Sequence, residues 1–299
     1  MTERRPFTWK SNDGLSIAAA DYPAISGDAL PLVCLPGLTR SARDFEALAR
    51  RISQGPIAPR RVFAISFRGR GASDYDPDWN HYSPLVEMED VRIGLEAAGI
   101  ERCHILGTSR GGMVATMLAS GNPGRVASLI FNDIGPVIEA RGLEFIRDYM
   151  GKPVVPASWD EAAATLKERH SARFTALSDA DWMHFARQTY RDENGAPALD
   201  FDENLGRTMD GVDFGKDLPD LWPVYDALPA IPILVIRGEN SNILSEKTVA
   251  EMIARRPTTE LMTVANEGHA PLLWKTEEAD HIAEFLQRAD ERAATAGTA

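Results

Sequence analysis

The sequence predicts an α/β fold: a doubly wound, mostly parallel sheet into which a helical cap is inserted. Five short apolar runs, each ended by a glycine, a proline or a polar turn, are typical of strands buried on both faces. Segments with helical patterning lie between these runs, and such alternation is typical of a sheet covered by helices on both sides. The alternation stops after residues 132–136, and no comparable run returns until Ile233, which indicates an inserted segment.

The order of the elements follows from the same patterns. Residues 7–19, with Asn12, Asp13 and Gly14 between two short runs, predict an antiparallel hairpin at the edge of the sheet. The apolar runs that we expect to form inner strands are residues 32–35, 62–65, 104–106, 129–131 and 233–236, with a weaker sixth run at 260–264. The helical segments expected between them include residues 42–51, 86–98, 112–120 and 247–255.

A chain of 299 residues has room for one large domain or two smaller ones. We expect a core built from residues 1–135 and 223–290, a cap formed by residues 136–222 and a flexible tail at residues 291–299. Ten of the 23 aromatic residues fall within the cap segment, more than its share by length, which favours a packed cap over a loose linker. The small, polar residues at the end of the chain are typical of a frayed terminus.

The charge balance and the cysteine count exclude several classes of function. A formal net charge of -12 disfavours nucleic acid and anionic membrane surfaces as partners, because both require clustered lysine and arginine. No stretch approaches the roughly 18 apolar residues of a membrane span, and no apolar run follows the first arginines, so we expect neither a span nor a signal peptide. Two cysteines, Cys34 and Cys103, are too few for a disulfide framework. We therefore expect a cytoplasmic protein, either a monomer or a homodimer.

The clearest chemical motif is the sequence GTSRG at residues 107–111, which follows an expected strand and opens an expected helix. This is the G-x-S-x-G pattern in the context that it requires, a strand followed by a tight turn and a helix. Small residues on both sides let strand and helix approach, so the hydroxyl of Ser109 is presented at the carboxyl edge of the sheet. A glycine-rich turn without chemistry is the alternative interpretation. A phosphate-binding loop fits less well, because Met113 stands where that motif needs lysine.

A serine hydroxyl is a weak nucleophile and requires a base. Of the six histidines, His269 lies on a loop directly after the last strand-like run, at the edge of the sheet where we expect Ser109. This position, together with its place after the serine in the chain, favours a catalytic role over a structural one. His104 and His281 belong to an expected strand and an expected helix and are interpreted as structural.

Four motifs together resemble those of the α/β-hydrolase family, close to its small esterases, lactonases and carbon–carbon bond hydrolases. They are LPGL at residues 35–38, FRGRGAS at 67–73, the GTSRG turn and the GH pair at 268–269, in the family's order. The resemblance covers about residues 7–135 and 225–290 and implies that the segment between them is a cap domain. It also implies an oxyanion hole, formed by the backbone N–H groups of Leu38 and Arg110, for the negative oxygen of a tetrahedral intermediate.

One position departs from the family's pattern. The third member of the catalytic triad usually follows the strand expected at residues 233–236, in a sequence similar to G-E-x-S-D, whereas this chain reads GENSN at 238–242. Asn242 therefore stands where a carboxylate is expected. Its amide oxygen can still accept a hydrogen bond from His269, but it carries no charge to stabilise an imidazolium. An Asp-to-Asn change of this kind in a serine protease costs about 10⁴ in kcat.

Three explanations of Asn242 are open. In the first, the acid comes from elsewhere: Asp133 follows an expected strand and lies 24 residues beyond Ser109, where some relatives place their acid. A plain turn residue is the alternative interpretation of Asp133. In the second, the chain is an engineered Asp-to-Asn variant. In the third, it is a descendant of an enzyme that now binds or senses a small molecule. Glu239 and Glu246 are minor candidates for the acid.

The resulting expectation is a serine hydrolase that needs no cofactor and no metal and acts on a small molecule. Ser109 attacks the carbonyl carbon of an ester or lactone, His269 takes the proton of its hydroxyl, and water later releases the acyl group. Hydrolysis of a carbon–carbon bond in a diketone-type substrate is the alternative reaction, because relatives perform it with the same triad. A small-molecule binding or sensor protein is the alternative outside enzymes.

The aromatic composition of the cap predicts an apolar substrate. The residues expected to bind it are Phe145, Trp182, His184 and Tyr190, and the further aromatic candidates of the cap are Tyr149, Trp159, Phe214 and Trp222. No basic cluster is expected around the site apart from Arg68, Arg70 and Arg110, which argues against a polyanionic substrate.

Overall fold

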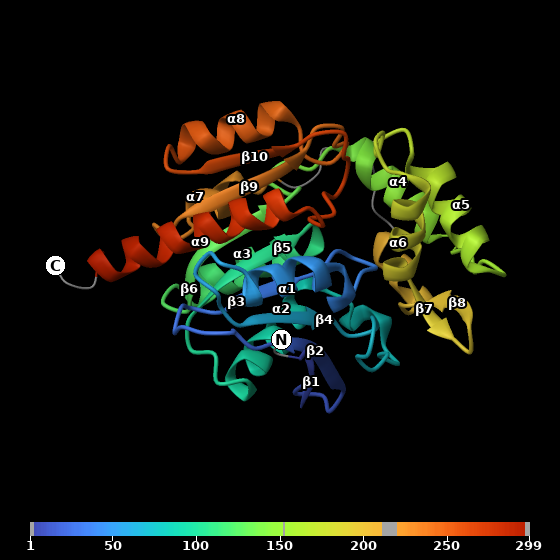
Figure 1. The fold of residues 1–299 in the computed structure, drawn as a ribbon, viewed down its shortest axis with the longest axis horizontal. Coiled ribbons are helices and arrows are strands. Elements are labelled where there is room, and N and C mark those ends of the chain that lie inside the picture. The colour runs from blue at the N-terminus through green and yellow to red at the C-terminus, as the bar shows by residue number, and fades with distance from the viewer. Residues whose placement is uncertain (1–2, 152, 211–219, 297–299) are drawn as a thin grey trace.

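A computed structural model of the chain describes residues 3–151, 153–210 and 220–296. Its centre is an eight-stranded sheet in the order β1-β2-β4-β3-β5-β6-β9-β10 (Figure 1). The first pairings, β1 with β2 and β2 with β4, are antiparallel, and all the others are parallel. The strands are β1 (Arg5–Lys10), β2 (Ser16–Tyr22), β3 (Leu32–Leu35), β4 (Val62–Ser66), β5 (Cys103–Thr108), β6 (Val126–Asn132), β9 (Ile233–Gly238) and β10 (Glu260–Val264). The predicted mostly parallel sheet and its edge hairpin are therefore confirmed.

Helices cover both faces of this sheet, as a doubly wound fold requires. One face packs against α2 (Pro84–Ala97), α3 (Arg110–Gly121), α7 (Trp222–Asp226) and α8 (Glu246–Arg255). The other face packs against α1 (Glu46–Gln54) and α9 (Thr276–Ala296), which also contact each other. Short 3-10 helices lie at η1 (Ala42–Phe45), η2 (Trp79–His81) and η3 (Glu203–Met209).

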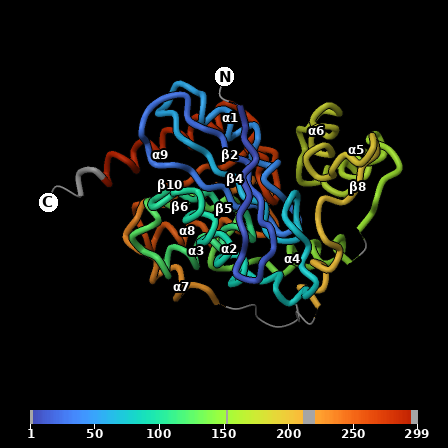
Figure 2. The backbone as a smooth tube through the Cα atoms, turned by 90° about the horizontal axis from the view of Figure 1, so that it is seen from below, coloured from blue at the N-terminus to red at the C-terminus, as the bar shows by residue number. Residues whose placement is uncertain are grey.

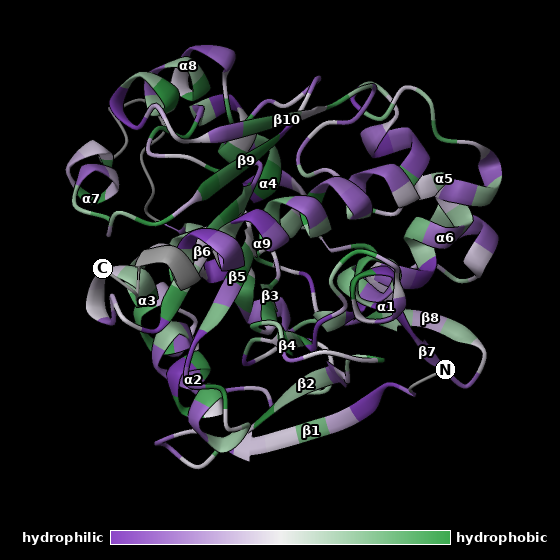
Figure 3. Cartoon of the chain, turned by 60° about the vertical axis from the view of Figure 1, so that its left-hand side comes forward, coloured by the Kyte–Doolittle hydropathy of each residue, from purple (hydrophilic) through white to green (hydrophobic). Residues whose placement is uncertain are grey.

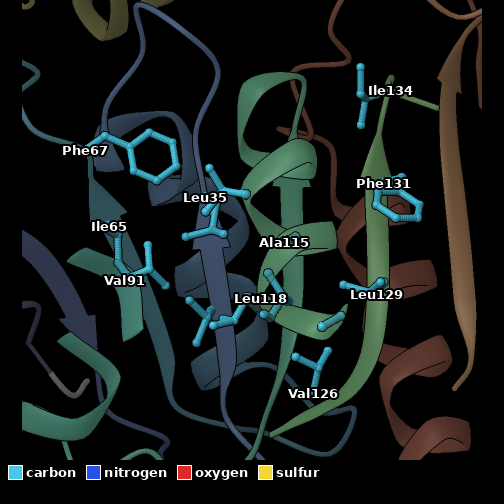
Figure 4. Close-up of a cluster of buried hydrophobic side chains, with 14 of the residues drawn as sticks. Leu35, Ile65, Phe67, Val91, Ala115, Leu118, Val126, Leu129, Phe131 and Ile134 are labelled. Carbon is cyan, nitrogen blue, oxygen red and sulfur yellow. The ribbon is translucent and has the colours of Figure 1, made fainter. Parts of the chain in front are cut away.

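The two-residue period of a strand decides which side chain enters which core. Along β3, Val33 and Leu35 belong to the core under α2 and α3, whereas Leu32 and Cys34 belong to the core under α1 and α9. Figure 4 shows part of the first core, where side chains of the strands meet those of α3. Because both faces are buried, the inner strands read as continuous apolar runs, and in Figure 3 β9 is mostly hydrophobic whereas the edge strand β1 is not.

The segment between β6 and β9 contributes no strand to the eight-stranded sheet within the residues described. Up to residue 210 its elements are α4 (Ala140–Met150), α5 (Trp159–His170), α6 (Asp179–Thr189), β7 (Tyr190–Glu193), β8 (Ala196–Leu199) and η3, and α7 follows just before β9. Figures 1 and 2 show α5, α6 and β8 grouped beside the sheet rather than over either of its faces. Buried side chains from Ala162 to Tyr190 give this group a small core of its own. We call residues 136–222 the cap.

Two features of this region and of the C-terminus differ from expectation. The cap is not purely helical, because β7 and β8 form an antiparallel hairpin around Asn194 and Gly195, which both have positive φ. The tail expected from residue 291 is helical up to Ala296, because α9 runs on without a break. Residues 297–299 lie outside the described residues. Within the described part of the chain, no helix combines the length and apolarity needed to cross a membrane.

Candidate active site

Ser109 lies in a sharp turn between the end of β5 and the start of α3. Its φ of 50° and ψ of -113° lie in a region that non-glycine residues rarely adopt, so the surrounding structure must hold the turn in place. Two glycines allow the necessary close approach. A Cβ on Gly107 would come within 2.5 Å of the backbone of Gly111, and a Cβ on Gly111 would overlap the carbonyl oxygen of Leu35. The local sequence therefore forces the hydroxyl of Ser109 out at the carboxyl edge of the sheet.

Ser109, His269 and Asp133 come together in one hydrogen-bonded series. The Nε2 atom of His269 lies 3.0 Å from the Oγ atom of Ser109, and its Nδ1 atom lies 2.8 Å from the Oδ2 atom of Asp133. The three side chains come from three separate segments: the turn after β5, the turn after β6 and the loop after β10. This arrangement can move a proton from the serine hydroxyl to the imidazole while the carboxylate stabilises the resulting cation.

The carboxylate of Asp133 is fully buried and held by two further donors. The backbone N–H of Gly238 donates to Oδ1 at 3.0 Å, and the hydroxyl of Ser241 donates to Oδ2 at 2.6 Å. Ser241 is itself fixed, because its Oγ atom accepts the backbone N–H groups of Ile243 and Leu244. The loop after β9 thus supplies donors for the carboxylate at the end of β6.

Asn242, which stands at the family's usual acid position, has no hydrogen bond to His269 among the contacts of the described residues. Its backbone carbonyl lies against Gly142 of α4, and the side chain is partly exposed. The geometry therefore separates the two candidates for the acid: Asp133 contacts the imidazole and Asn242 does not. The minor candidates Glu239 and Glu246 bond instead to the backbone of Asn266 and to Arg237.

The two residues expected to form the oxyanion hole belong to segments close to Ser109. Leu38 and Ser109 line one pocket. Arg110 is the first residue of α3, so its N–H group has no acceptor within the helix and is available at the helix N-terminus. Three ionic side chains, two of them fully buried, connect the two segments.

These three side chains, Arg70, Glu87 and Arg110, are called the ionic brace below. The Nε atom of Arg70 donates to the carbonyl oxygen of Leu38 at 2.8 Å, and its Nη1 atom lies 2.8 Å from Oε1 of Glu87. The other carboxylate oxygen of Glu87 accepts from Nε of Arg110 at 2.7 Å. Arg70 and Glu87 are fully buried. The brace links the loop that carries Leu38 to the helix that begins at Arg110.

A pocket of about 150 Å³ opens in front of Ser109. The core supplies its floor, which includes Leu38, Asn132 and His269. The cap supplies its roof, whose polar or charged members are Tyr149, Arg169, His170, Gln188, Thr189 and Tyr190. Apolar side chains of both parts complete the wall, so a substrate reaching Ser109 contacts the cap.

Of the four cap residues expected to bind substrate, Tyr190 lines this pocket and the other three do not. Trp182 is 2% exposed inside the cap's own core, and the ring of His184 packs at 4.5 Å against Trp274. Phe145 does not line the pocket and packs against Tyr149 and Arg173.

Of the further aromatic candidates in the cap, Tyr149 lines the pocket. Trp159 and Trp222 do not, and the ring of each is covered by an arginine guanidinium. Phe214 lies outside the described residues.

The basic groups near the site are different from those expected. Arg68 is buried against Asp13, Asp76 and Asp90, and Arg70 and Arg110 are held by Glu87, so none of the three lines the pocket. The pocket contains other basic side chains, contributed by Arg40, Arg169 and His170. Sequence patterns could not predict them, because Arg40 lies in a loop and Arg169 and His170 end a helix, where basic residues are most often solvated.

The pKa of His170 falls to about 3, because the side chain is buried and lies near Arg169, Arg40, Arg173 and His269. His170 is therefore neutral at physiological pH. Burial raises the pKa of Tyr149 and of Tyr190, so both phenols keep their protons and can act as hydrogen-bond donors in the pocket.

One group of side chains away from the pocket has a composition found in metal sites: Asp13, Asp76 and His81. Arg68 already donates to Asp13 and Asp76, at 2.7 and 2.6 Å, and its hydrogen bond and its charge hold the pKa of Asp13 at about 2. The group is thus an ion-pair network that ties the β1–β2 hairpin to the loop after β4.

Comparison with known proteins gives a consistent family. The family model for the alpha/beta hydrolase fold matches residues 31–276. The 3-hydroxybutyrate-oligomer hydrolase of Cupriavidus necator is 31% identical over 248 residues, which are 80% of this chain and 82% of that protein. The sn-1-specific diacylglycerol lipase ABHD11 of Mus musculus is 25% identical over 265 residues, which are 87% of this chain and 82% of that protein.

A solved structure agrees over nearly the whole chain. The crystal structure of an alpha/beta hydrolase from Novosphingobium aromaticivorans is 37% identical, has a TM-score of 0.86, and matches across 96% of this chain and 99% of that one. The chain belongs to the alpha/beta hydrolase fold family and is a hydrolase.

Proposed function

We propose that this protein is a serine hydrolase that cleaves carboxylic esters, cyclic esters (lactones) included, through an acyl-enzyme. The observation that carries the proposal is the hydrogen-bonded series of Asp133, His269 and Ser109 on the floor of a pocket. A nucleophile, a base in contact with it and a group that orients the base are the three parts that acyl transfer requires.

In the first half-reaction the Oγ atom of Ser109 attacks the carbonyl carbon while Nε2 of His269 takes the hydroxyl proton. The carbonyl oxygen becomes negative, and the N–H groups of Leu38 and Arg110 stabilise it. Each such donor contributes about 10² to 10³ in rate. When the tetrahedral intermediate collapses, the bond to the alcohol oxygen breaks, and His269 returns its proton to the leaving alcohol.

In the second half-reaction water replaces the alcohol. His269 takes a proton from the water, the hydroxide attacks the acyl carbon, and the proton passes to Ser109 as the acid leaves. The carboxylate of Asp133 stabilises the imidazolium in both halves, and Gly238 and Ser241 hold its two oxygens in place. The cap residues that roof the pocket select the substrate.

The relatives support ester chemistry. The two curated relatives above are named for the hydrolysis of hydroxybutyrate oligomers and of diacylglycerol, and both names describe ester bonds. A carbon–carbon bond hydrolase would use the same three residues, and a screen of substrates separates the two reactions. The alternative of a binding or sensor protein was based on Asn242, and the contact between the carboxylate of Asp133 and His269 favours an enzyme over this alternative.

The direct test is the variant Ser109→Ala assayed with 4-nitrophenyl butyrate. We expect kcat to fall by about 10⁴-fold or more, because the nucleophile is lost while the fold is kept. Ser120→Ala is the matched control, because Ser120 is an exposed serine near the other end of α3. Undiminished turnover in Ser109→Ala, with an unchanged melting temperature, would overturn the proposal.

A further inference from the structure

We propose that Arg169 binds a carboxylate of the substrate, so that the preferred substrates are esters that carry an acid group at the far end of a short apolar chain. This inference rests on the proposed ester hydrolysis at Ser109 and adds the substrate class. It departs from the apolar substrate that the composition of the cap predicts.

Arg169 reaches the same pocket as the nucleophile. It lies in the last turn of α5, is partly buried, and lines the pocket together with Ser109 and His269. Its guanidinium carbon lies 5.5 Å from the centre of the Tyr149 ring, which fixes the planar group against an aromatic wall. The charge therefore faces the space in which a substrate must lie.

The guanidinium of Arg169 has no carboxylate partner among the described residues. The neighbouring Arg40 shows the contrast: its Nε and Nη2 atoms both donate to Asp44, at 2.8 and 2.6 Å. Asp44 is the one acidic side chain in the described wall of the pocket, and Arg40 uses both of its oxygens. The pocket is therefore left with an unbalanced positive charge.

Neighbouring groups respond to this charge. Burial is the main reason for the low pKa of His170, and the positive charges of Arg169 and Arg40 lower it further. Arg169 also opposes the rise that burial causes in the pKa of Tyr149 and Tyr190. All three side chains line the pocket, so its roof favours negative charge even though the whole chain carries a net charge of -12.

A carboxylate is the anion that fits best. A guanidinium offers a planar fork of donors that matches a carboxylate with two parallel hydrogen bonds. Besides Arg169 and Ser109, the wall of the pocket includes Ile146, Leu166 and Leu199, which suit a short hydrocarbon chain. The pocket thus has a position for the reacting ester at its floor and a position for an acid group at its roof.

The experiment compares two esters that differ only in charge: the 4-nitrophenyl monoester of adipic acid and its neutral methyl ester, with the corresponding suberic acid pair for a longer chain. Ser109→Ala gives the background rate. For the wild type we expect kcat/KM to be higher for the acid than for the methyl ester. In Arg169→Gln we expect this ratio to fall by about ten- to a hundredfold, the usual effect of a hydrogen bond to a charged group.

Two further variants make the result decisive. Arg169→Glu reverses the charge and should make the ratio lower still, whereas Arg187→Gln should leave it unchanged. Arg187 is a matched control, because its guanidinium also lies over an aromatic ring of the cap, that of Trp159, outside the pocket. Equal ratios in wild type and Arg169→Gln, while Ser109→Ala is inactive, would overturn the carboxylate site alone. Activity that survives in Ser109→Ala would instead overturn the proposed function.

Discussion

Asp133 is the member of the proposed catalytic triad that stands furthest from the position expected from the family's sequence pattern. At the family's usual acid position the chain has Asn242, and the carboxylate that contacts His269 stands at the end of another strand. Asp133 and His269 are separated by 136 residues along the chain. Ser109 could be predicted because its motif is local, and His269 because it follows the last strand. Asp133 could only be kept as one of several candidates, because a turn aspartate and a catalytic one look alike until the loop after β9 is placed beside them.

This difference predicts opposite outcomes for two substitutions. Asp133→Asn should lower kcat by about 10⁴-fold, because an amide neither stabilises the imidazolium nor holds the required tautomer of His269. Asn242→Asp should change kcat by less than about threefold, since the side chain does not contact the imidazole. Both are measured with the same aryl ester. A sharp rise of kcat in Asn242→Asp, with Asp133→Asn still active, would show that the acid belongs after β9.

At the scale of elements, the proposed oxyanion hole requires that the start of α3 and the loop after β3 keep a fixed position relative to each other. The ionic brace does this through Glu87 of α2, which contacts both Arg70 and Arg110. Sequence patterns predicted the helix around Glu87 but could not predict the brace, because a charged residue in a helix normally faces solvent. The hairpin of β7 and β8 was missed for a related reason: its strands have four residues each, and β8 contains a proline.

Replacing Glu87 tests the brace. In Glu87→Gln we expect kcat to fall by about ten- to a hundredfold with little change in KM, because the donors for the oxyanion shift while the cap side of the pocket is intact. Loss of the buried carboxylate should also cost about 3–5 kcal/mol of stability. Arg110→Gln, which breaks one arm and keeps the backbone N–H, provides a second and milder variant.

Glu89→Gln is the control for both effects. Glu89 lies on the same helix but pairs with Arg92 at the partly exposed surface, so its loss should leave kcat unchanged. If kcat and KM of Glu87→Gln and Arg110→Gln match those of the wild type, the brace has no part in positioning the oxyanion hole.

At the scale of the whole molecule, the α/β pattern was predictable because nearly every inner strand is buried on both faces. The helical end of the chain was not predictable, because the last residues of α9 are small or polar and are typical of a frayed terminus. Directly before the expected tail, at the last residue assigned to the core, α9 makes a long-range contact. Asp290 lies 2.8 Å from Arg60 and 2.9 Å from His104, and both partners have fully buried side chains.

Asp290→Ala should therefore destabilise the protein by about 2–4 kcal/mol, since it leaves a buried guanidinium without its ion pair. Urea denaturation gives the free energy of unfolding. Glu284→Ala, an exposed change on the same helix, should stay within about 0.5 kcal/mol of the wild type. Equal stabilities of the two variants would mean that the ion pair and hydrogen bond of Asp290 do not stabilise the fold.

The central claim is that Ser109 is the nucleophile of this hydrolase. It is tested most directly by treating the protein with diethyl 4-nitrophenyl phosphate, which transfers its phosphoryl group to an activated serine, and by locating the adduct with mass spectrometry. We predict one diethylphosphoryl group, on Ser109, and loss of ester hydrolysis in proportion to it, with no adduct in Ser109→Ala. Loss of activity with the adduct on another residue, or full activity in the labelled protein, would contradict the account.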